Sequence, residues 1–261
     1  MNIKKIKAIY FSPNKATKEI VNKLAKSIGD YEVEEIDLTY LKSRGQEIRF
    51  NRDELVVIGF PVYSDRLPVI ADGIFEKVQG NNTPAVAVVS YGNRDYGDAL
   101  LELRNRLEEK NMKVISAAAI IGEHCLNRNV AKGRPDLEDD FKIVGYANKI
   151  NERIKSIEDV NSLEEIHIKG NYPYRPLKES RTPVGDSKCI QCGLCERSCP
   201  VEAIDKTDYR KTDSDLCIFC GRCINVCPTG ARNIKDELFL ESMKKFEITA
   251  SERKEIEIFM D

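Results

Sequence analysis

Eight of the nine cysteines in this 261-residue chain lie in two copies of one pattern. Each copy reads C-x-x-C-x-x-C-x-x-x-C-P, and the second follows the first at an offset of 28 residues. Gly193 and Gly221 repeat at the same offset, as do the prolines that end each copy. This duplicated array constrains the fold strongly, because it predicts two metal centres of the same kind.

The spacing within each copy indicates iron–sulfur cubanes. Three cysteines at C-x-x-C-x-x-C can wrap one face of a [4Fe-4S] cluster and bind three of its irons, and the fourth cysteine then crosses to the other cluster. The first cluster is predicted to bind Cys189, Cys192, Cys195 and Cys227. The second cluster is predicted to bind Cys217, Cys220, Cys223 and Cys199.

Zinc and disulfide bonds are the alternatives to iron. Structural zinc favours two separated C-x-x-C pairs around one tetrahedron, and disulfides need an oxidising compartment. The N-terminal segment MNIKKIKAIYFS has too short an apolar run for a signal peptide and lacks a small-residue cleavage site. No apolar run approaches the ~20 residues that span a bilayer. We therefore expect a cytoplasmic iron–sulfur protein without a membrane segment.

Residues 187–233, which hold the doubled motif, resemble the bacterial two-cluster [4Fe-4S] ferredoxins. The formal charge of the chain is −2, and two clusters with their thiolates would bring it to about −6. Between Lys188 and Arg232, seven basic residues face six acidic ones. Neither balance favours nucleic-acid binding or strong electrostatic steering of partners. The expected partners are redox proteins.

The first 157 residues alternate between strand and helix patterns. Apolar runs predict buried strands at residues 5–12, 31–38, 54–60, 85–90 and 114–122. Helices are predicted after Thr17, ending near Gly29, and at residues 67–78, 96–110 and 137–157. In the last of these helices, Phe141, Val144, Ala147, Ile150 and Ile154 are expected to face inward. The predicted fold is a five-stranded, doubly wound parallel α/β sheet, followed by a small α+β domain.

Ligands of such sheets bind beyond the carboxyl ends of the strands, so three strand-end loops matter most. After the first strand, a polar loop precedes a helix N-terminus and suits a phosphate; its candidate residues are Ser12, Asn14, Lys15, Ala16 and Thr17. Two aromatic loops follow later strands, with candidate residues Pro61, Val62, Tyr63, Ser64, Tyr91, Gly92, Asn93, Asp95 and Tyr96. Together the three loops predict a flavin mononucleotide (FMN) pocket. The alternatives are an ordinary βα turn with a polar cap and surface tyrosines.

Residues 1–157 resemble the flavodoxin-like domain, whose phosphate loop follows the pattern T/S-x-T-G-x-T. This chain keeps Ser12 and Thr17, and has Asn14 and Lys15 in place of the central Thr and Gly. The whole chain is similar to flavodoxin–ferredoxin fusion proteins, in the segments FPVYSDRLP, YGNRDYGDALLEL and GEHCLNRNVAKGRPD and in the doubled cysteine motif. The resemblance implies electron transfer between FMN and two low-potential [4Fe-4S] clusters.

Two other functions stay open at this point. The chain could be a flavin-dependent reductase of a small acceptor that is fed by the clusters. It could also be a ferredoxin whose sheet domain is a docking scaffold without flavin. The pattern indicates an electron carrier rather than an enzyme with its own substrate.

Three remaining segments fit no motif. Residues 158–186 contain three prolines and are interpreted as a linker across the surface. Residues 234–261 predict a helical tail that carries Leu238, Leu240, Met243 and Phe246. Cys125 lies outside both motifs and is interpreted as an unliganded thiol, with His124 as its only suggestive neighbour.

Overall fold

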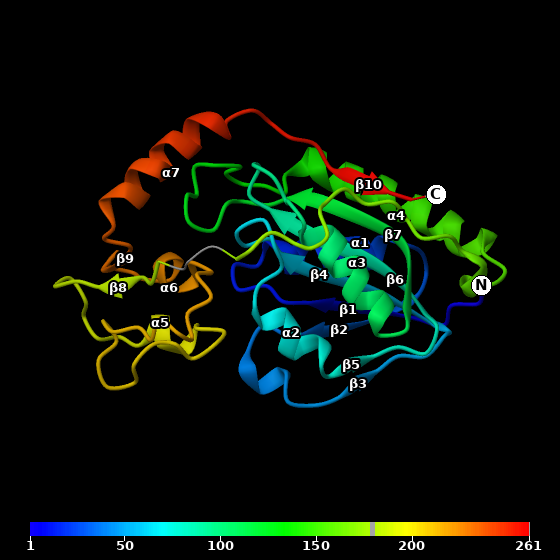
Figure 1. Ribbon diagram of the computed structural model, residues 1–261, viewed down its shortest axis with the longest axis horizontal. Coiled ribbons are helices and arrows are strands. Elements are labelled where there is room, and N and C mark those ends of the chain that lie inside the picture. Colours follow the sequence, from blue (N-terminus) through cyan, green and yellow to red (C-terminus); the bar gives the residue numbers. More distant parts are fainter. Residues whose placement is uncertain (178–180, 261) are drawn as a thin grey trace.

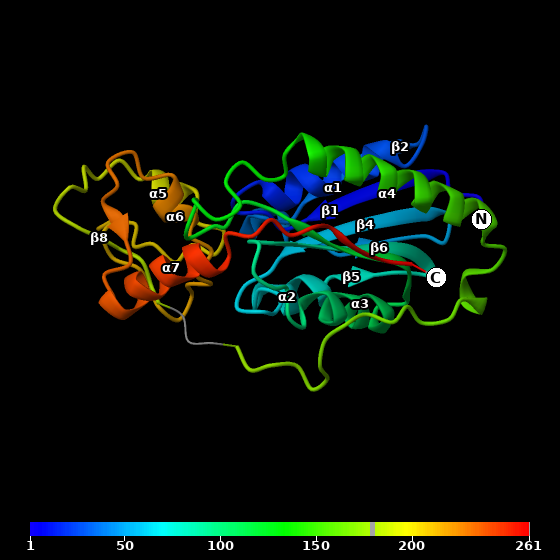
Figure 2. The same ribbon diagram turned by 90° about the horizontal axis from the view of Figure 1, so that it is seen from above.

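The computed structural model describes residues 1–177 and 181–260 (Figure 1). A large sheet domain occupies one end of the molecule, and the cysteine-rich segment forms a small domain at the other (Figures 1 and 2). Both chain ends lie on the side of the sheet domain that is far from the small domain. The small domain therefore faces the carboxyl ends of the parallel strands.

In the described part of the chain, six strands form the central sheet, in the order β10-β7-β6-β4-β1-β2. Their bounds are Lys5–Tyr10 (β1), Glu32–Asp37 (β2), Glu54–Pro61 (β4), Thr83–Tyr91 (β6), Met112–Ile121 (β7) and Glu257–Phe259 (β10). All pairs are parallel except β10 with β7. The parallel strands taken in chain order have the spatial order 2-1-3-4-5, which is the flavodoxin-like order. The predicted flavodoxin-like α/β fold is confirmed.

Helices cover both faces of this sheet (Figure 2). One face carries α1 (Ala16–Ser27) and α4 (Leu137–Ser156), and the other carries α2 (Ile70–Phe75) and α3 (Ala99–Glu109). The central strands are buried on both sides, which explains why β6 is buried along its whole length and reads TPAVAVVSY. Short pieces complete the domain: the 3₁₀ turns η1 (Leu41–Ser43) and η2 (Val160–Ser162), and the parallel pair of β3 (Ile48–Arg49) with β5 (Val78–Gln79).

The inner face of α4 differs from the prediction. Phe141 and Val144 are 78 % and 40 % exposed, so placing them inward was wrong. The buried stripe instead runs through Ile143, Tyr146, Ala147, Ile150 and Ile154. This stripe keeps the i, i+3, i+4 spacing of a helix face, and Tyr146 belongs to it because its hydroxyl lies 2.6 Å from the Ser116 hydroxyl. The buried ring of α4 is therefore that of Tyr146, whose hydroxyl has a partner, and not that of Phe141, which hydrophobicity alone predicted.

The C-terminal segment adds the sixth strand. After α7 (Glu237–Thr249) the chain returns to the sheet, and β10 pairs antiparallel with β7, Phe259 opposite Ala117 (Figure 1). The prediction of five strands was therefore one short. Three residues are too few for a periodic signal, and β10 forms only because the edge of β7 offers unpaired backbone groups.

The small domain is built from two similar turns. It contains β8 (Val184–Gly185), α5 (Leu194–Arg197), α6 (Arg222–Asn225) and β9 (Arg232–Asn233), and β8 pairs antiparallel with β9. Residues 158–177 run along the surface of the sheet domain, with Ile166 and Ile168 buried against its core. The Asp98 carboxylate accepts hydrogen bonds from the backbone N–H groups of Asn171 and Arg175.

A buried ion pair ties α4 to the loop that follows β7. Asp139 is fully buried and its carboxylate binds the Arg134 guanidinium, which is 5 % exposed. The Asp139 carboxylate also accepts the backbone N–H of Asp136, closing a capping box at the start of α4. The pair thus fixes where residues 122–134 lie beyond the strand end.

We predict that Asp139→Asn destabilises the protein by about 3–5 kcal/mol, because it removes the nearest carboxylate from the buried Arg134 charge and leaves only the longer pair with Asp136 at 3.9 Å. Anaerobic urea unfolding measures this. The control is Lys142→Gln, which breaks an exposed pair with Glu138 and should cost about 0–1 kcal/mol. Equal losses in the two variants would contradict the assignment.

Candidate redox site

The two copies of the cysteine motif share one backbone conformation. Left-handed φ angles occur at Gln191 and Phe219 (54° and 57°), at Gly193 and Gly221 (72° and 71°), and at Glu202 and Gly230 (53° and 65°). Each pair is related by the same 28-residue offset as the cysteines. The glycines cap α5 and α6, where a Cβ on Gly193 would lie 2.7 Å from an Arg197 nitrogen. The sequence repeat is therefore also a structural repeat.

One set of cysteines surrounds a hollow in the small domain. Cys189, Cys192 and Cys195 come from the first copy and Cys227 from the second, and Tyr209 and Arg232 complete the wall. Burial raises the pKa of the Cys195 thiol, and the Arg232 charge opposes this. The structure thus brings together the four residues that the sequence assigns to the first cluster.

In the other set, Cys199 of the first copy lies near Cys217, Cys220 and Cys223 of the second copy. Burial raises the pKa of Cys223 to about 11; Arg232 opposes the rise, and the nearby Cys217 and Cys199 add to it. Burial also raises the pKa of Cys220, with smaller contributions from Cys223 and Cys199. The Cys199 sulfur accepts the backbone N–H of Ala203 at 3.3 Å. Cys199 therefore lies beside thiols of the second copy.

The spacing of these thiols differs from that of a single-ion site. Among the described residues, no three His, Cys, Asp or Glu side chains gather closely enough to hold one metal ion. A cubane takes its thiolates at four separate irons, so its ligands stand further apart. The donor set and its glycine-lined turns fit such a group.

The second copy packs directly on the strand-end loops of the sheet domain. Asn14 donates its side-chain N–H to the Cys220 carbonyl at 2.7 Å, and Asn225 donates to the Asn14 oxygen and to the Cys125 carbonyl, each at 3.0 Å. A Cβ on Gly221 would lie 2.9 Å from that carbonyl, so only glycine allows this approach. The predicted phosphate ligand Asn14 is thus a link between the two domains.

The loop before α1 has the shape of an anion site. Lys15 caps the helix with φ at 73° and makes no side-chain cap. Because the Lys18 N–H already bonds Ser12, the first-turn N–H groups of Ala16 and Thr17 are, in the described part of the chain, the ones left for another acceptor. Ser12 accepts the backbone N–H of Lys18 at 3.0 Å, and the Thr17 hydroxyl lies 2.6 Å from the Ser90 hydroxyl. Lys15 therefore adopts the left-handed conformation for which the flavodoxin pattern uses glycine.

Two connected hollows lie beyond this loop. The smaller one has a volume of about 60 Å³, which is enough for a phosphate-sized group but not for a flavin ring. It is lined by residues of four strand-end loops: Ser12, Pro13, Asn14, Ala16, Thr17, Pro61, Val62, Tyr63, Ser90, Tyr91, Gly92, Gly122, Glu123, His124 and Cys125. The larger one, about 510 Å³, shares Val62, Tyr63, Tyr91, Gly92, His124 and Cys125 with it. We call the larger hollow the interdomain cleft, because Cys217, Ile218 and Phe219 of the small domain also line it.

The remaining predicted residues divide between the cleft and the tail. Ser64 and Asp95 line the interdomain cleft, and Lys15 lines a neighbouring hollow of about 370 Å³. Asn93 instead donates to the carbonyls of Ala250 and Glu252, and Tyr96 donates to Glu257. The side chains of Asn93 and Tyr96 thus hold the C-terminal segment, and neither residue lines either hollow.

His124 and Cys125 are site residues that the sequence reasoning missed. Both line both hollows, and burial raises the pKa of the Cys125 thiol to about 12. Burial lowers the pKa of His124 to about 4, helped by the Arg94 charge. Its Nδ1 accepts the N–H groups of Leu126 and Asn127, so the neutral ring carries its proton on Nε2. The sequence feature that could have identified them is their position in the loop after the fifth predicted strand, where ligands of such sheets bind.

The C-terminal helix closes the cleft from outside. Phe239, Ser242, Met243 and Phe246 of α7 line it, and the Phe246 ring lies 4.8 Å from the His124 ring. Asn127 donates to the Met243 carbonyl at 3.1 Å. Of the four apolar residues predicted for the tail, Met243 and Phe246 line the cleft, whereas Leu238 and Leu240 are 74 % and 47 % exposed.

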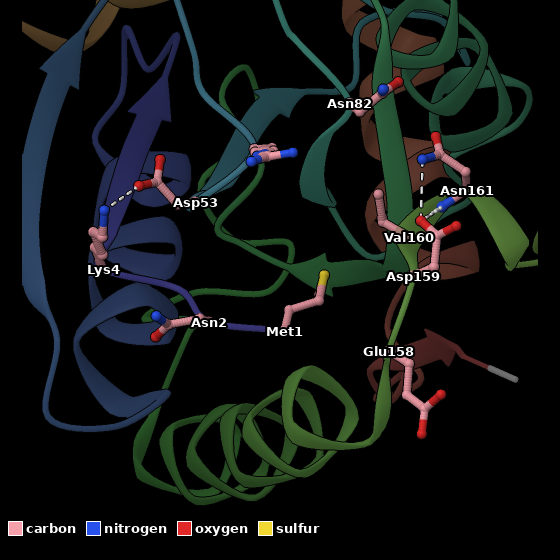
Figure 3. Close-up of a pocket in the computed structure, with 10 residues that line it drawn as sticks. Met1, Asn2, Lys4, Asp53, Asn82, Glu158, Asp159, Val160 and Asn161 are labelled. Carbon is pink, nitrogen blue, oxygen red and sulfur yellow. Dashed lines mark hydrogen bonds and ion pairs between the residues drawn. The ribbon is translucent and has the colours of Figure 1, made fainter.

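A further hollow of about 430 Å³ lies at the opposite end of the sheet (Figure 3). Most of its lining residues are polar or charged, with an ion pair between Lys4 and Asp53 at 2.8 Å and a hydrogen bond from Asn161 to Asp159. It lies at the amino ends of the parallel strands and contains no predicted site residue. Ligands of doubly wound sheets bind at the other end.

Comparison with known proteins supports the iron–sulfur assignment. Residues 188–231 match the family model of the 4Fe-4S dicluster domain. No curated protein matches the chain. None of the helices in residues 1–177 and 181–260 is long and apolar enough to cross a membrane.

Several solved structures are similar to the sheet domain. A flavodoxin from the domain Archaea is 16 % identical with a TM-score of 0.40, covering 58 % of this chain and 99 % of its own. The two-electron reduced Megasphaera elsdenii flavodoxin is 18 % identical with a TM-score of 0.38, covering 54 % and 96 %. Rubredoxin oxygen:oxidoreductase from Desulfovibrio gigas is 16 % identical with a TM-score of 0.43, covering 59 % and 37 %.

We predict that burial of His124 makes stability fall in mild acid. Its folded pKa of about 4 lies below the ordinary value of 6.5, so the unfolded chain binds the proton first as pH falls. The contribution is complete above pH 6.5, and roughly 2 kcal/mol is lost between pH 7 and 5. Anaerobic urea unfolding of wild type and His124→Gln measures it. A wild-type loss no larger than that of the variant would contradict the prediction.

Proposed function

We propose that this chain binds two [4Fe-4S] clusters and one FMN and relays electrons between them and external redox proteins. The observation that supports the proposal is the shared wall of the interdomain cleft. Cys217 of the second cysteine set lines that cleft together with Tyr63 and Tyr91 of the predicted flavin loops. Such a wall brings a thiolate-bound cluster close to a flavin.

The two cysteine sets would hold the clusters with crossed ligation. Cys189, Cys192, Cys195 and Cys227 line one hollow, while Cys199 lies beside Cys220 and Cys223. The backbone N–H groups in the glycine-capped turns are placed to bond the cluster sulfurs. These N–H groups and the burial of the thiols would set the potentials.

The strand-end loops would hold the flavin. The phosphate would bind the N–H groups of Ala16 and Thr17 at the start of α1 in the smaller hollow, beside Ser12. The ring system requires the larger, aromatic-lined space, where Tyr63, Tyr91 and Phe246 form apolar walls. Met243 and Phe246 of α7 line the same space.

The two cysteine sets differ in position. The Cys220 carbonyl bonds Asn14 of the flavin loop, whereas Cys192 is exposed and its neighbour Ile190 is 65 % exposed. The first set therefore faces possible partners, and the second lies between it and the cleft. When bound, FMN exchanges one or two electrons and each cubane exchanges one, so the chain connects two-electron chemistry to one-electron carriers.

We predict that Cys220→Ala interrupts this relay. After anaerobic one-electron reduction of the clusters, wild-type flavin should bleach at a rate independent of protein concentration, because the transfer is intramolecular. Stopped-flow absorbance measures it. Cys220→Ala should slow that phase at least tenfold. A flavin-free purified protein, or a rate that scales with concentration, would contradict the relay.

Matched cysteine variants test the crossed ligation in the same preparation. Cys199→Ala should give the same low-temperature EPR spectrum as Cys220→Ala, and Cys227→Ala the same as Cys195→Ala. The reason is that each pair removes a thiolate from one cluster. If Cys199→Ala instead resembles Cys195→Ala, each motif holds its own cluster and the crossed assignment is wrong.

We predict that Lys15→Glu weakens FMN binding at least tenfold and leaves riboflavin binding nearly unchanged. The added carboxylate would repel a phosphate at the start of α1, while riboflavin has no phosphate. Fluorescence titration of the flavin-depleted protein compares the two ligands. Lys42→Glu on η1 is the control for a change of surface charge. Equal losses for FMN and riboflavin would mean that the phosphate binds elsewhere.

A further inference from the structure

A fully buried arginine lies between the two cysteine sets. Arg232 begins β9 and is only 2 % exposed, and it is the largest of the fully buried side chains. It lies outside the cysteine motif, which ends with Pro228, so the motif alone gives no role to it. Arginine is almost never fully buried unless its charge is paired, so this burial needs an explanation.

Arg232 contacts both sets. It lines the hollow formed by Cys189, Cys192, Cys195 and Cys227. On its other side, Nη2 lies 3.9 Å from the sulfur of Cys223, in the second set. Its backbone N–H also favours the thiolate of Cys227. One residue therefore faces sulfur ligands that the proposed function assigns to different clusters.

The described partners of the guanidinium are neutral. It donates to the carbonyl oxygens of Tyr209 at 2.8 Å, Arg210 at 3.2 Å and Pro183 at 2.8 Å, and to the Thr212 hydroxyl. Among the described residues, its Nε has no hydrogen-bond partner. These contacts satisfy most of the N–H groups, but none of them supplies a negative charge.

A buried charge is costly unless an opposite charge lies near it. The eight thiolates and their two clusters carry a net charge of about −4 in the oxidised state, and one more negative charge for each electron added. The cysteine sets on either side of Arg232 are therefore the source of compensating charge. The guanidinium would be bound most favourably when the clusters are reduced.

We infer that Arg232 is a positioning residue shared by the two clusters, whose buried positive charge raises the reduction potential of both. The inference rests on the proposed function, because it needs both clusters in place. Its physical basis is that a cation in a low-dielectric site stabilises the more negative, reduced form of each neighbouring cluster. The shared position couples the two potentials to one side chain.

A purely structural role makes a different prediction. The bonds from Arg232 to Pro183, Thr212 and Tyr209 tie β8 and the intervening loop together. If they were its whole contribution, replacement would loosen the domain without moving both potentials in one direction. The effect of charge can therefore be separated from the effect of contacts.

The experiment is protein-film voltammetry, with EPR-monitored redox titration, of anaerobically purified full-length wild type, Arg232→Gln and Arg232→Lys. Arg232→Gln removes the charge, and both cluster potentials should become more negative. Arg232→Lys keeps the charge but loses most carbonyl bonds, and its potentials should stay near the wild-type values. Arg197→Gln is the matched control, since Arg197 is exposed and bonds the Cys192 carbonyl at 3.1 Å; solvent screening should keep its effect small.

The outcomes separate the two proposals. Wild-type protein without iron–sulfur clusters would overturn the proposed function and this inference with it. Loaded Arg232→Gln with unchanged potentials, or with a change in one cluster only, would overturn this inference alone. If Arg232→Gln does not assemble its clusters, Arg232→Lys decides: loaded protein with wild-type potentials supports the charge, and lowered potentials refute it.

Discussion

The arrangement of the two domains depends on backbone carbonyls of the cysteine motifs that accept side-chain hydrogen bonds from the sheet domain: Asn14 bonds the Cys220 carbonyl and the buried Arg44 bonds the Pro200 carbonyl, each at 2.7 Å. The Asn14 bond joins the loop that begins α1 to the backbone of the second cysteine motif, and Asn225 reinforces it from the other side. The bare backbone of Gly221 lets the Cys125 carbonyl come close at the same point. Because these hydrogen bonds are short and partly buried, they hold the second cysteine set against the strand ends of the sheet. Both the cleft and the order of the cysteine sets follow from these contacts.

The C-terminal segment covers one side of the cleft. It leaves the small domain through α7, covers the cleft with Phe246 and Met243, and then joins the sheet edge as β10. Asn93 fastens the turn between them by donating to two of its carbonyls. The C-terminal segment is thus held at both ends, by the cysteine domain before α7 and by the sheet edge at β10. A covered cleft between two domains suits a cofactor that must stay close to a metal centre and away from water.

Much of this arrangement could be predicted from the sequence, where the signal was local. The cysteine spacing predicted two groups of thiols, of which the structure gathers Cys189, Cys192, Cys195 and Cys227 around one hollow. The buried strands, including β6, were evident as apolar runs. What could not be predicted depended on tertiary contacts. Asn93 and Tyr96 looked like strand-end ligands, but the tail that binds them lies more than 150 residues away. The inward face of α4 was misplaced because a satisfied hydroxyl made Tyr146, rather than Phe141, the buried ring. Arg232 had no motif to mark it.

The central claim is that two cubanes and one flavin occupy the cysteine sets and the adjoining cleft. The most direct test is the cofactor content of strictly anaerobic protein, with iron, sulfide, zinc and FMN counted per chain. Our account predicts about eight iron, about eight sulfide and one FMN, with no stoichiometric zinc. Zinc in place of iron, without a brown chromophore, would contradict it.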